Sequence, residues 1–231
     1  MERRKQAAAR STTAPDAARP AGREPRVSLR EQQRDLTRNR VLDGAVTVFS
    51  RTSFVHATME DIAAASGVTR ATVYAHFGGK AAIIAALSDR VYAVADALYE
   101  DLAAVPEWNR DTVRAWLDRA AANWRALAPT IRVLFGATPS AAGDDGDVRD
   151  RYVAAHERYV DLLTLDAGRW RGVSPEEARQ RALMASLQTG SFLTTWIAGG
   201  LPLGTADPLD LLADDLCHLL APALHPLPGP P

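Results

Sequence analysis

The chain has little of what several classes of protein require. Among its 231 residues there is a single cysteine, Cys217, so no disulfide can form within the chain, as in proteins of a reducing cytoplasm. No apolar run reaches the length of about 18 residues that a membrane-spanning helix needs. The basic N-terminus is not followed by an apolar segment, so we expect no secretory signal. These absences predict a cytoplasmic protein.

The sequence also lacks the motifs of most catalytic and metal sites. Its five histidines have no cysteine or carboxylate partners at the spacing of metal ligands. Neither a phosphate-binding glycine loop nor a nucleophile elbow is present. The acidic cluster within residues 144–150 is interpreted as a solvated loop. We predict a protein that is not an enzyme and needs no metal or cofactor, with an all-helical enzyme as the alternative from another class.

Charge is divided unevenly along the chain, although the net charge is only −1. Residues 1–80 carry 14 Lys and Arg against 8 Asp and Glu, whereas residues 81–231 carry 13 against 20. Phosphate neutralisation supplies most of the non-specific affinity for DNA, so this division is typical of a DNA-facing part joined to a part that avoids DNA. Such asymmetry also occurs in proteins without a nucleic-acid partner, and it does not decide the function by itself.

The most informative segment is residues 58–80, which read TMEDIAAASGVTRATVYAHFGGK. Its pattern predicts two short helices joined by a tight turn. Thr58 and Thr69 precede the two helices, where a hydroxyl can accept hydrogen bonds from free backbone N–H groups. Gly67 stands where the first helix must end, in the left-handed conformation that glycine tolerates.

The second of these helices has two contrasting faces. Val73 and Phe77 are four residues apart and predict its buried side. The other side carries hydroxyls, a guanidinium and a phenol, which suits a helix that enters the major groove of DNA. The alternative is an ordinary pair of core helices, which does not call for these polar residues. The exposed set is Thr69, Arg70, Ala71, Thr72, Tyr74 and His76.

This segment resembles the helix-turn-helix of the tetracycline-repressor (TetR) family of transcriptional regulators. The pattern Gly-Val-Thr-x-x-Thr-Val-Tyr-x-His-Phe-x-x-Lys matches without a gap, and the resemblance covers about residues 36–82. The rest of the chain is compatible with the family in length and helical character but has no signature of similar strength. The matching residues are Thr58, Ile62, Ala63, Gly67, Val68, Thr69, Thr72, Tyr74, His76, Phe77 and Lys80.

The resemblance implies that some side chains of this segment contact DNA bases and that others contact phosphates. Arg70 and Ala71 occupy positions that vary in the family, and geometry alone supports them: Arg70 can reach guanine or phosphate, and Ala71 a thymine methyl. For base contacts we expect Thr69, Arg70, Ala71 and Thr72. For phosphate contacts we expect Thr58, Thr69, Tyr74, His76 and Lys80, with Arg51 as a further candidate.

The apolar pattern predicts an all-α fold of about nine helices, with a helix-turn-helix domain followed by a helical ligand-binding and dimerisation domain. Residues 1–34 predict a disordered basic arm, which either reaches the minor groove or only adds positive potential. We place the domains at 35–80 and 81–222 and a loose tail at 223–231. We place the helices at 36–51, two within 58–77, and then near 80–104, 109–127, 129–137, 147–170, 175–198 and 207–221.

In the family, the last two long helices pack against their copies in a second subunit. The resemblance therefore implies a homodimer formed by residues 175–198 and 207–221. Two-fold symmetry would set two recognition helices about 34–36 Å apart, or at a longer spacing, on a palindromic operator. Apolar residues such as Leu183 and Leu216 could serve the interface, or they could all belong to the core of one subunit.

Aromatic residues are only 6% of the chain, yet four of its five tryptophans lie within residues 108–170. This clustering predicts an aromatic-lined cavity between helices, with a few polar groups, suited to a small apolar ligand. Plain filling of the core is the alternative. The candidate lining residues are Trp116, Asn123, Trp124, Phe135, Tyr152, His156, Tyr159, Gln188, Phe192, Thr195 and Trp196.

Together, these observations predict a sequence-specific DNA-binding transcriptional regulator. The resemblance implies a repressor that a small apolar ligand, bound in the C-terminal domain, releases from its operator. Ligand binding would favour a state in which the 80–104 helix has moved, so that the two DNA-binding domains of the dimer no longer fit successive major grooves. Ligand and DNA would therefore each weaken the binding of the other. The alternative is a DNA-binding regulator without a small ligand.

Overall fold

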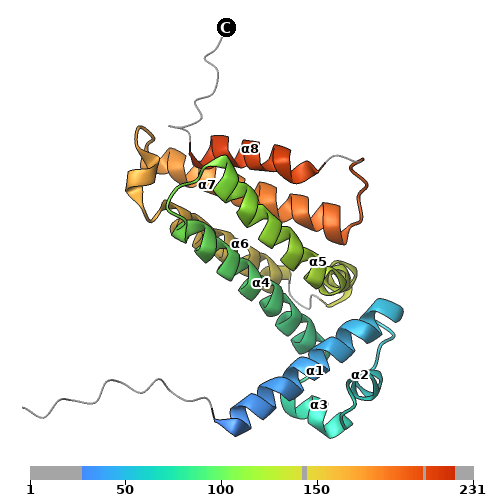
Figure 1. Cartoon of the computed structure of the whole chain (residues 1–231). Helices are drawn as coiled ribbons and strands as arrows, with labels where there is room; N and C mark the ends of the chain where they lie inside the picture. The colour runs from blue at the N-terminus through green and yellow to red at the C-terminus, as the bar shows by residue number, and fades with distance from the viewer. Residues whose placement is uncertain (1–27, 142–144, 205–206, 222–231) are drawn as a thin grey trace, which may run out of the picture.

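The computed structural model describes residues 28–141, 145–204 and 207–221. Over these residues it is all-helical and contains no strand, which confirms the predicted fold class (Figure 1). The expected tail at 223–231 and most of the expected basic arm lie outside the described residues. The elements are α1 (Leu29–Arg51), α2 (Met59–Ser66), α3 (Arg70–His76), α4 (Lys80–Ala104), α5 (Arg110–Ala141), α6 (Asp145–Thr164), η1 (Ala167–Trp170), α7 (Pro175–Leu193), η2 (Thr194–Ala198) and α8 (Pro208–Leu220).

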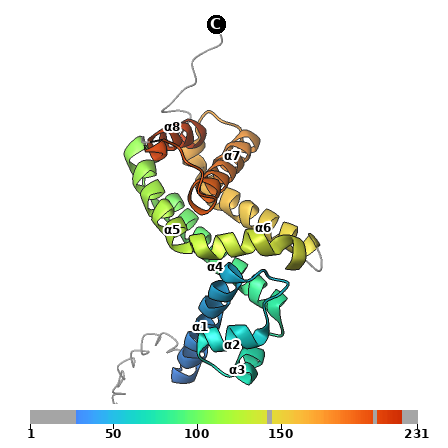
Figure 2. The same cartoon turned by 90° about the vertical axis from the view of Figure 1, so that its right-hand side faces the viewer.

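Two hydrophobic cores divide the helices into a head and a body. The head comprises α1, α2, α3 and the start of α4, packed around residues such as Val41, Ile62 and Val73. The body comprises the rest of α4 with α5 to α8, packed around residues such as Trp116 and Leu216. In Figures 1 and 2 the head lies below the body, and α4 runs from one into the other. Helix α4 is therefore a continuous connection between the two cores.

The first helix begins at Leu29, seven residues before the expected start at Leu36, which corrects the predicted extent of the arm. The Ser28 hydroxyl accepts a hydrogen bond from the Glu31 backbone N–H at 3.2 Å, and the Glu31 carboxylate accepts one from the Ser28 N–H at 2.8 Å. This capping box satisfies two free donors at once. The first turns of α1 have no apolar stripe because they extend past the head and remain exposed.

The two helices expected at 109–127 and 129–137 form one continuous helix, α5, which leaves eight α-helices among the described residues instead of about nine. Pro129 lies inside it and is exposed. Proline removes one helical hydrogen bond and tends to bend a helix without always ending it. Figure 2 shows the two halves of α5 running in different directions. The second half reaches the head, where Val133 is buried in the head core.

The boundaries of α7 and α8 follow their predicted caps, whereas the helix expected at 147–170 ends at Thr164 and is followed by the short 3-10 helix η1. The Ser174 hydroxyl accepts a hydrogen bond from the Glu177 N–H at 3.1 Å, and the Asp207 carboxylate accepts one from the Leu209 N–H at 3.0 Å. The last turn of the expected 175–198 helix is π-helical rather than α-helical. Within the described residues, no helix combines the length and apolar character needed to cross a bilayer.

Candidate nucleic-acid interface and cavity

Helix α2 is fixed at both of its ends. The Thr58 hydroxyl accepts a hydrogen bond from the Asp61 N–H at 3.1 Å and donates one to the Asp61 carboxylate at 2.7 Å. The Thr58 N–H also donates to that carboxylate, and these bonds hold the pKa of Asp61 below its ordinary value. At the other end Gly67 has a φ of 64°, a conformation that favours glycine. The cap and the glycine together set the sharp turn into α3.

The close approach of α1 and α2 depends on a second glycine. A Cβ atom on Gly44 would lie 2.2 Å from the Ser66 hydroxyl oxygen and 2.9 Å from the Ser66 backbone nitrogen. The Arg40 guanidinium donates to the carbonyl oxygen of Ser66 at 3.1 Å, at the C-terminal end of α2. Helix α1 therefore holds α2, and with it the turn that orients α3.

Helix α3 has the two faces that its sequence predicts. Val73 is buried, and Phe77 is buried at the position that ends the helix. On the other side Arg70 and Ala71 are exposed, and Tyr74 is 45% exposed. The Thr69 hydroxyl caps the helix by accepting from the Thr72 N–H at 3.1 Å, and the Thr69 and Thr72 hydroxyls lie 2.8 Å apart. His76 is half-buried.

Arg70 makes two contacts in the DNA-free protein. Its guanidinium forms an ion pair with Glu60 of α2 and lies 5.3 Å from the centroid of the Tyr74 ring. Both residues of the ion pair are largely exposed, so the pair is weak and water can replace it. Arg70 is therefore held close to the exposed face of α3 and is able to exchange Glu60 for another anion.

Lys80 has a different environment from the one expected of a phosphate contact. Its ammonium donates to the carbonyl oxygens of Phe54 at 2.6 Å, Ala57 at 2.8 Å and Val55 at 3.1 Å. An ammonium has three protons, and all three are used here. The Lys80 side chain thus ties the start of α4 to the loop before α2. This environment favours a positioning role, and the expected phosphate contact stays a prediction.

A basic stripe on α1 was not recognised in the sequence. Arg30, Arg34 and Arg38 recur every four residues and share one face of the helix. Arg30 and Arg34 are exposed, and the Arg38 guanidinium carbon lies 5.1 Å from the centroid of the Phe77 ring, at the end of α3. The stripe therefore adjoins the recognition helix. Its regular spacing was available in the sequence, but Arg30 and Arg34 lay within the segment interpreted as a disordered arm.

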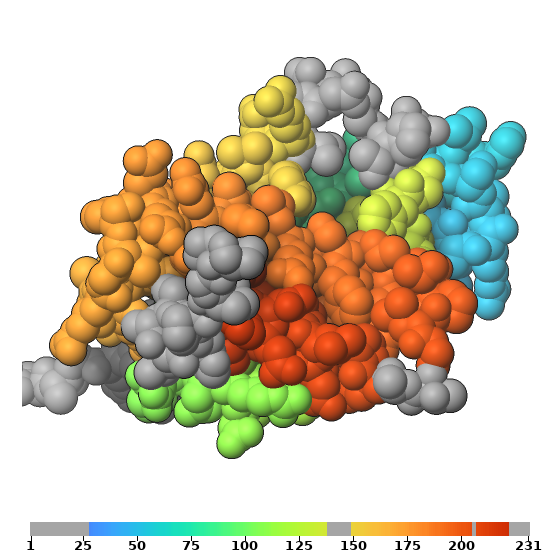
Figure 3. Space-filling view, turned by 90° about the horizontal axis from the view of Figure 1, so that it is seen from above, coloured from blue at the N-terminus to red at the C-terminus, as the bar shows by residue number. Residues whose placement is uncertain are grey.

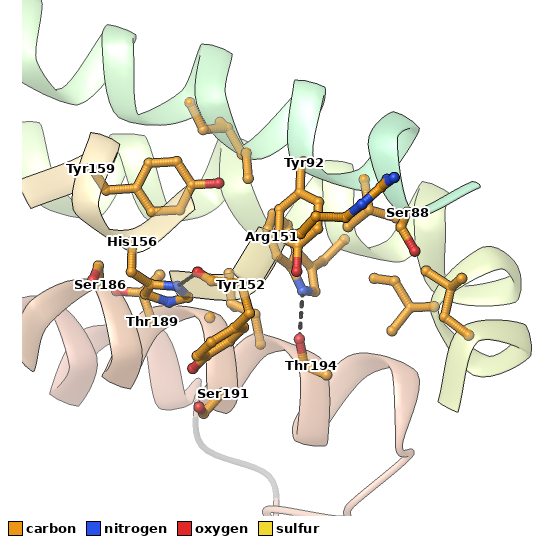
Figure 4. Close-up of a pocket in the computed structure, with 18 of the residues that line it drawn as sticks. Ser88, Tyr92, Arg151, Tyr152, His156, Tyr159, Ser186, Thr189, Ser191 and Thr194 are labelled. Carbon is orange, nitrogen blue, oxygen red and sulfur yellow. Dashed lines mark hydrogen bonds between the residues drawn. The ribbon is translucent and has the colours of Figure 1, made fainter. Parts of the chain in front are cut away.

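The body contains a cavity of about 670 Å³. Its wall is formed by residues of α4, α5, α6, α7 and η2, and Figure 4 shows side chains from these elements turned toward a shared space. A volume of this size is typical of sites for drug-sized molecules. The wall includes seven of the residues expected from sequence: Trp116, Trp124, Phe135, Tyr152, His156, Tyr159 and Thr195.

Four other expected residues are not part of the cavity wall, which corrects their assignment. The Asn123 amide donates to the Arg119 carbonyl of its own helix, and the Gln188 amide donates to Asp215 on α8. Phe192 and Trp196 pack against each other with ring centroids 5.7 Å apart. Each of the four is next in sequence to a residue that lines the cavity. A step of one residue turns a side chain by about 100° around a helix, so these neighbours point away from the cavity.

The sequence analysis missed the contribution of α4 to the cavity. Tyr92 and Tyr99 lie seven residues apart, which is two turns, and both line the wall. The Tyr99 and Tyr159 rings stack with centroids 4.1 Å apart, and Tyr99 also contacts Trp116 at 5.5 Å. Burial raises the pKa of Tyr99, so its phenol remains protonated. One side of the cavity is consequently a continuous series of aromatic rings.

The cavity reaches the boundary between body and head. Ile84 of α4 and Leu134 of α5 both line the cavity and pack against the head core. Ala81, the residue after Lys80, also lines the cavity. A molecule in the cavity would therefore contact side chains that support the head, with no intervening layer.

Comparison with protein families agrees with this arrangement. The model of "Bacterial regulatory proteins, tetR family" matches residues 41–87. The uncharacterized HTH-type transcriptional regulator TtgW of Pseudomonas putida is 30% identical over 128 residues, which are 55% of this chain and 91% of TtgW. The HTH-type transcriptional regulator SrpR of Pseudomonas putida is also 30% identical over 128 residues, and they span 57% of its length.

Solved structures with the same fold extend the comparison over most of the chain. A SmeT–triclosan complex has a TM-score of 0.58 at 21% identity and matches 80% of this chain and 90% of SmeT. NalD, the secondary repressor of the MexAB-OprM multidrug efflux pump in Pseudomonas aeruginosa, has a TM-score of 0.52 at 21% identity, over 82% of this chain and 95% of NalD. At such identities the likeness shows the fold of head and body together.

Proposed function

The chain belongs to the TetR family of bacterial transcriptional regulators, and we propose that it is a repressor released from a palindromic operator by a small apolar ligand. The family consists of regulators and not of enzymes. The observation that carries the proposal is that α3 has two different faces. One face buries Val73, and the other presents Arg70, Ala71 and Tyr74 to solvent. Such a helix can enter a major groove without losing its support.

The chemistry of the exposed groups determines which of them contact bases and which contact phosphates. Thr69, Arg70, Ala71 and Thr72 read base edges, because they lie at the N-terminal end of the recognition helix. Thr58, Thr69, Tyr74 and His76 position the protein on the backbone by hydrogen bonds to phosphate. Arg30 and Arg34 add positive charge beside them, and Lys80 orients the unit without touching DNA.

Two copies of the chain are needed to cover an operator, and the outer face of α7 and α8 is the proposed interface. Figure 3 views the molecule toward these two helices, which lie side by side. Leu183 and Met184 of α7 are 39% and 57% exposed, and Leu211 of α8 is 73% exposed. Leu216 is buried within the subunit. Exposed apolar side chains on neighbouring helices favour burial against a second copy.

The cavity supports a small neutral ligand. The described residues of its wall are mostly apolar and aromatic and include no Asp or Glu. The one Lys or Arg side chain among them, Arg151, forms an ion pair with Asp89 at 2.6 Å. SmeT, a protein of the same fold, binds triclosan. A ligand that contacts Ile84 and Leu134 would displace α4 against the head, and the resulting coupling with DNA is typically about 1–3 kcal/mol.

The test measures operator affinity with and without a bound probe. Duplexes are first selected from genomic DNA, and triclosan is then titrated into the complex. We expect a loss of operator affinity of about 5- to 150-fold. Ala120→Phe, which fills the cavity beside Trp116 and Trp124, should leave the ligand-free affinity unchanged and abolish the response. If triclosan quenches the cavity tryptophans but leaves operator affinity unaltered, the ligand-release mechanism is wrong and regulation without a small ligand is favoured.

A further inference from the structure

The buried serine and threonine hydroxyls of the cavity wall donate their protons in hydrogen bonds to backbone carbonyls of the protein. The Ser186 hydroxyl donates to the Leu183 carbonyl at 2.9 Å, and the Thr189 hydroxyl donates to the Ala185 carbonyl at 2.8 Å. Both side chains are buried. A hydroxyl bonded back to its own helix keeps free lone pairs but has no proton to offer a ligand.

Several N–H and O–H groups of the aromatic rings in the wall also donate hydrogen bonds within the protein. The Trp124 indole N–H donates to the Thr194 hydroxyl oxygen at 3.0 Å, as Figure 4 shows, and the Trp116 N–H donates to the Leu98 carbonyl at 2.7 Å. The Tyr99 hydroxyl donates to the Ser186 carbonyl at 3.3 Å. The aromatic wall therefore offers stacking surfaces with few free protons.

His156 provides an open acceptor. Its Nδ1 atom lies 2.9 Å from the backbone carbonyl oxygen of Tyr152, and Figure 4 shows this bond beside the cavity. A carbonyl oxygen can only accept, so Nδ1 carries the proton, and in a neutral imidazole Nε2 then has a free lone pair. No group among the described residues forms a hydrogen bond with Nε2.

Not every proton of the wall is used: the half-buried Ser88 and Tyr92 hydroxyls form no hydrogen bond with the described residues. The buried Tyr159 hydroxyl forms no hydrogen bond with the described residues but lies near the Asp96 carboxylate; burial and this charge raise its pKa. The Tyr152 side chain is 44% exposed, and Ser191 and Thr195 are also exposed. The cavity therefore offers both donors and acceptors, and His156 supplies an acceptor that no proton of the described residues occupies.

We propose that the cavity selects a neutral aromatic ligand carrying a hydroxyl or N–H donor, and that Nε2 of His156 accepts this proton in a hydrogen bond. This inference rests on the cavity assigned above as the ligand site. The ring series of Tyr99, Tyr159 and Trp116 provides stacking partners for the aromatic part of the ligand. A ligand without the donor leaves the acceptor unpaired after it has lost its water, which weakens binding.

The experiment compares 4-hydroxystilbene with 4-methoxystilbene by equilibrium dialysis against the full-length dimer. The methoxy group keeps the oxygen and removes the proton. Both compounds are measured at pH 8. The wild-type protein should bind the hydroxyl compound about 10-fold to 100-fold more tightly, as expected for one unpaired polar group. His156→Phe should remove most of this ratio while still binding the methoxy compound, which shows that the variant is folded.

Two further variants sharpen the comparison. His156→Gln keeps an acceptor oxygen and should retain part of the preference. His56→Phe changes an exposed histidine of the head, outside the cavity wall, so the ratio should be unchanged.

Two results would overturn the inference while leaving the ligand site itself intact. One is equal binding of the two compounds by the wild-type protein. The other is a preference that persists undiminished in His156→Phe. If neither compound binds, the inference and the ligand half of the proposed function both fail, whereas DNA selectivity, measured separately, is unaffected.

Discussion

The ammonium of Lys80 donates a hydrogen bond to the carbonyl oxygen of Phe54 across 2.6 Å and lies 4.8 Å from the centroid of the Phe54 ring. This contact joins the first residue of the helix that lines the cavity to the loop that precedes the helix-turn-helix. The same ammonium holds two more carbonyls of that loop, at Val55 and Ala57. Lys80 is thus a positioning residue between the two parts of the protein.

Substitution of Lys80 should separate positioning from phosphate contact. Lys80→Met should weaken binding to all duplexes by about 10-fold, as expected for loss of hydrogen bonds worth about 1.4 kcal/mol, with the salt dependence unchanged. Lys80→Arg should not restore affinity, because a planar guanidinium cannot direct its protons to these three carbonyls. Salt titrations of operator binding provide the measurement. A slope reduced by about 1.8 in Lys80→Met, as expected for one phosphate per subunit of the proposed dimer, together with full rescue by arginine, would instead assign Lys80 to a phosphate.

Arg70 should determine sequence preference. Arg70→Ala removes a guanidinium from the N-terminal end of the recognition helix and should cost about 1–3 kcal/mol at one base position, flattening the preference there. Glu60→Gln removes the partner of Arg70 in the free protein, so operator affinity should rise slightly. Binding to a set of single-base operator variants provides the measurement. Equal losses on every sequence for Arg70→Ala would make it a backbone contact.

The basic stripe of α1 should contribute charge and no sequence information. Replacing Arg30 and Arg34 together by glutamine should lower the magnitude of the salt slope by about 3.6, at about 0.9 for each of the four phosphate contacts of the proposed dimer, and weaken all sequences alike. Arg171→Gln, which changes an exposed arginine of the body, is the matched control and should leave the slope unaltered. An unchanged slope in the double variant would show that the stripe does not face DNA.

The Thr58–Asp61 cap predicts how the stability of the protein depends on pH. The Asp61 carboxylate has a lowered pKa because it accepts hydrogen bonds from Thr58, so its contribution to stability is complete above the ordinary aspartate pKa. That contribution is lost as the pH falls through the lowered folded-state value. Thermal unfolding of wild type and Asp61→Asn should therefore differ at neutral pH and converge in acid. A difference that stays constant down to about pH 2 would argue against this cap as its source.

Local signals in the sequence predicted much of the fold. The caps at Thr58, Thr69 and Ser174 and the turn at Gly67 each depend on residues within four positions of one another, and the structure contains all of them. The same reasoning applied to Ser28 and Glu31 would have found the true start of α1. Pro129 was misinterpreted because proline in a helix has two outcomes, a bend or an end, and the choice depends on packing along the rest of α5.

The site depends more on tertiary contacts, and sequence reasoning was weaker there. The three carbonyls held by Lys80 come from a loop more than twenty residues earlier in the chain. The residues facing the cavity differ from their neighbours by one position around a helix, as Thr195 differs from Trp196. An aromatic-rich sequence can indicate that a cavity exists, but which ring faces it is fixed by the rotation of each helix against its neighbours.

The most direct test of the central claim is the affinity of the full-length protein for duplexes selected from its own genome, compared with random DNA of equal length at moderate salt. We expect a palindromic sequence to be bound at least about 1,000-fold more tightly than random DNA, and this preference to be reduced in Arg70→Ala. Equal affinity of the folded protein for both kinds of duplex would contradict the central claim.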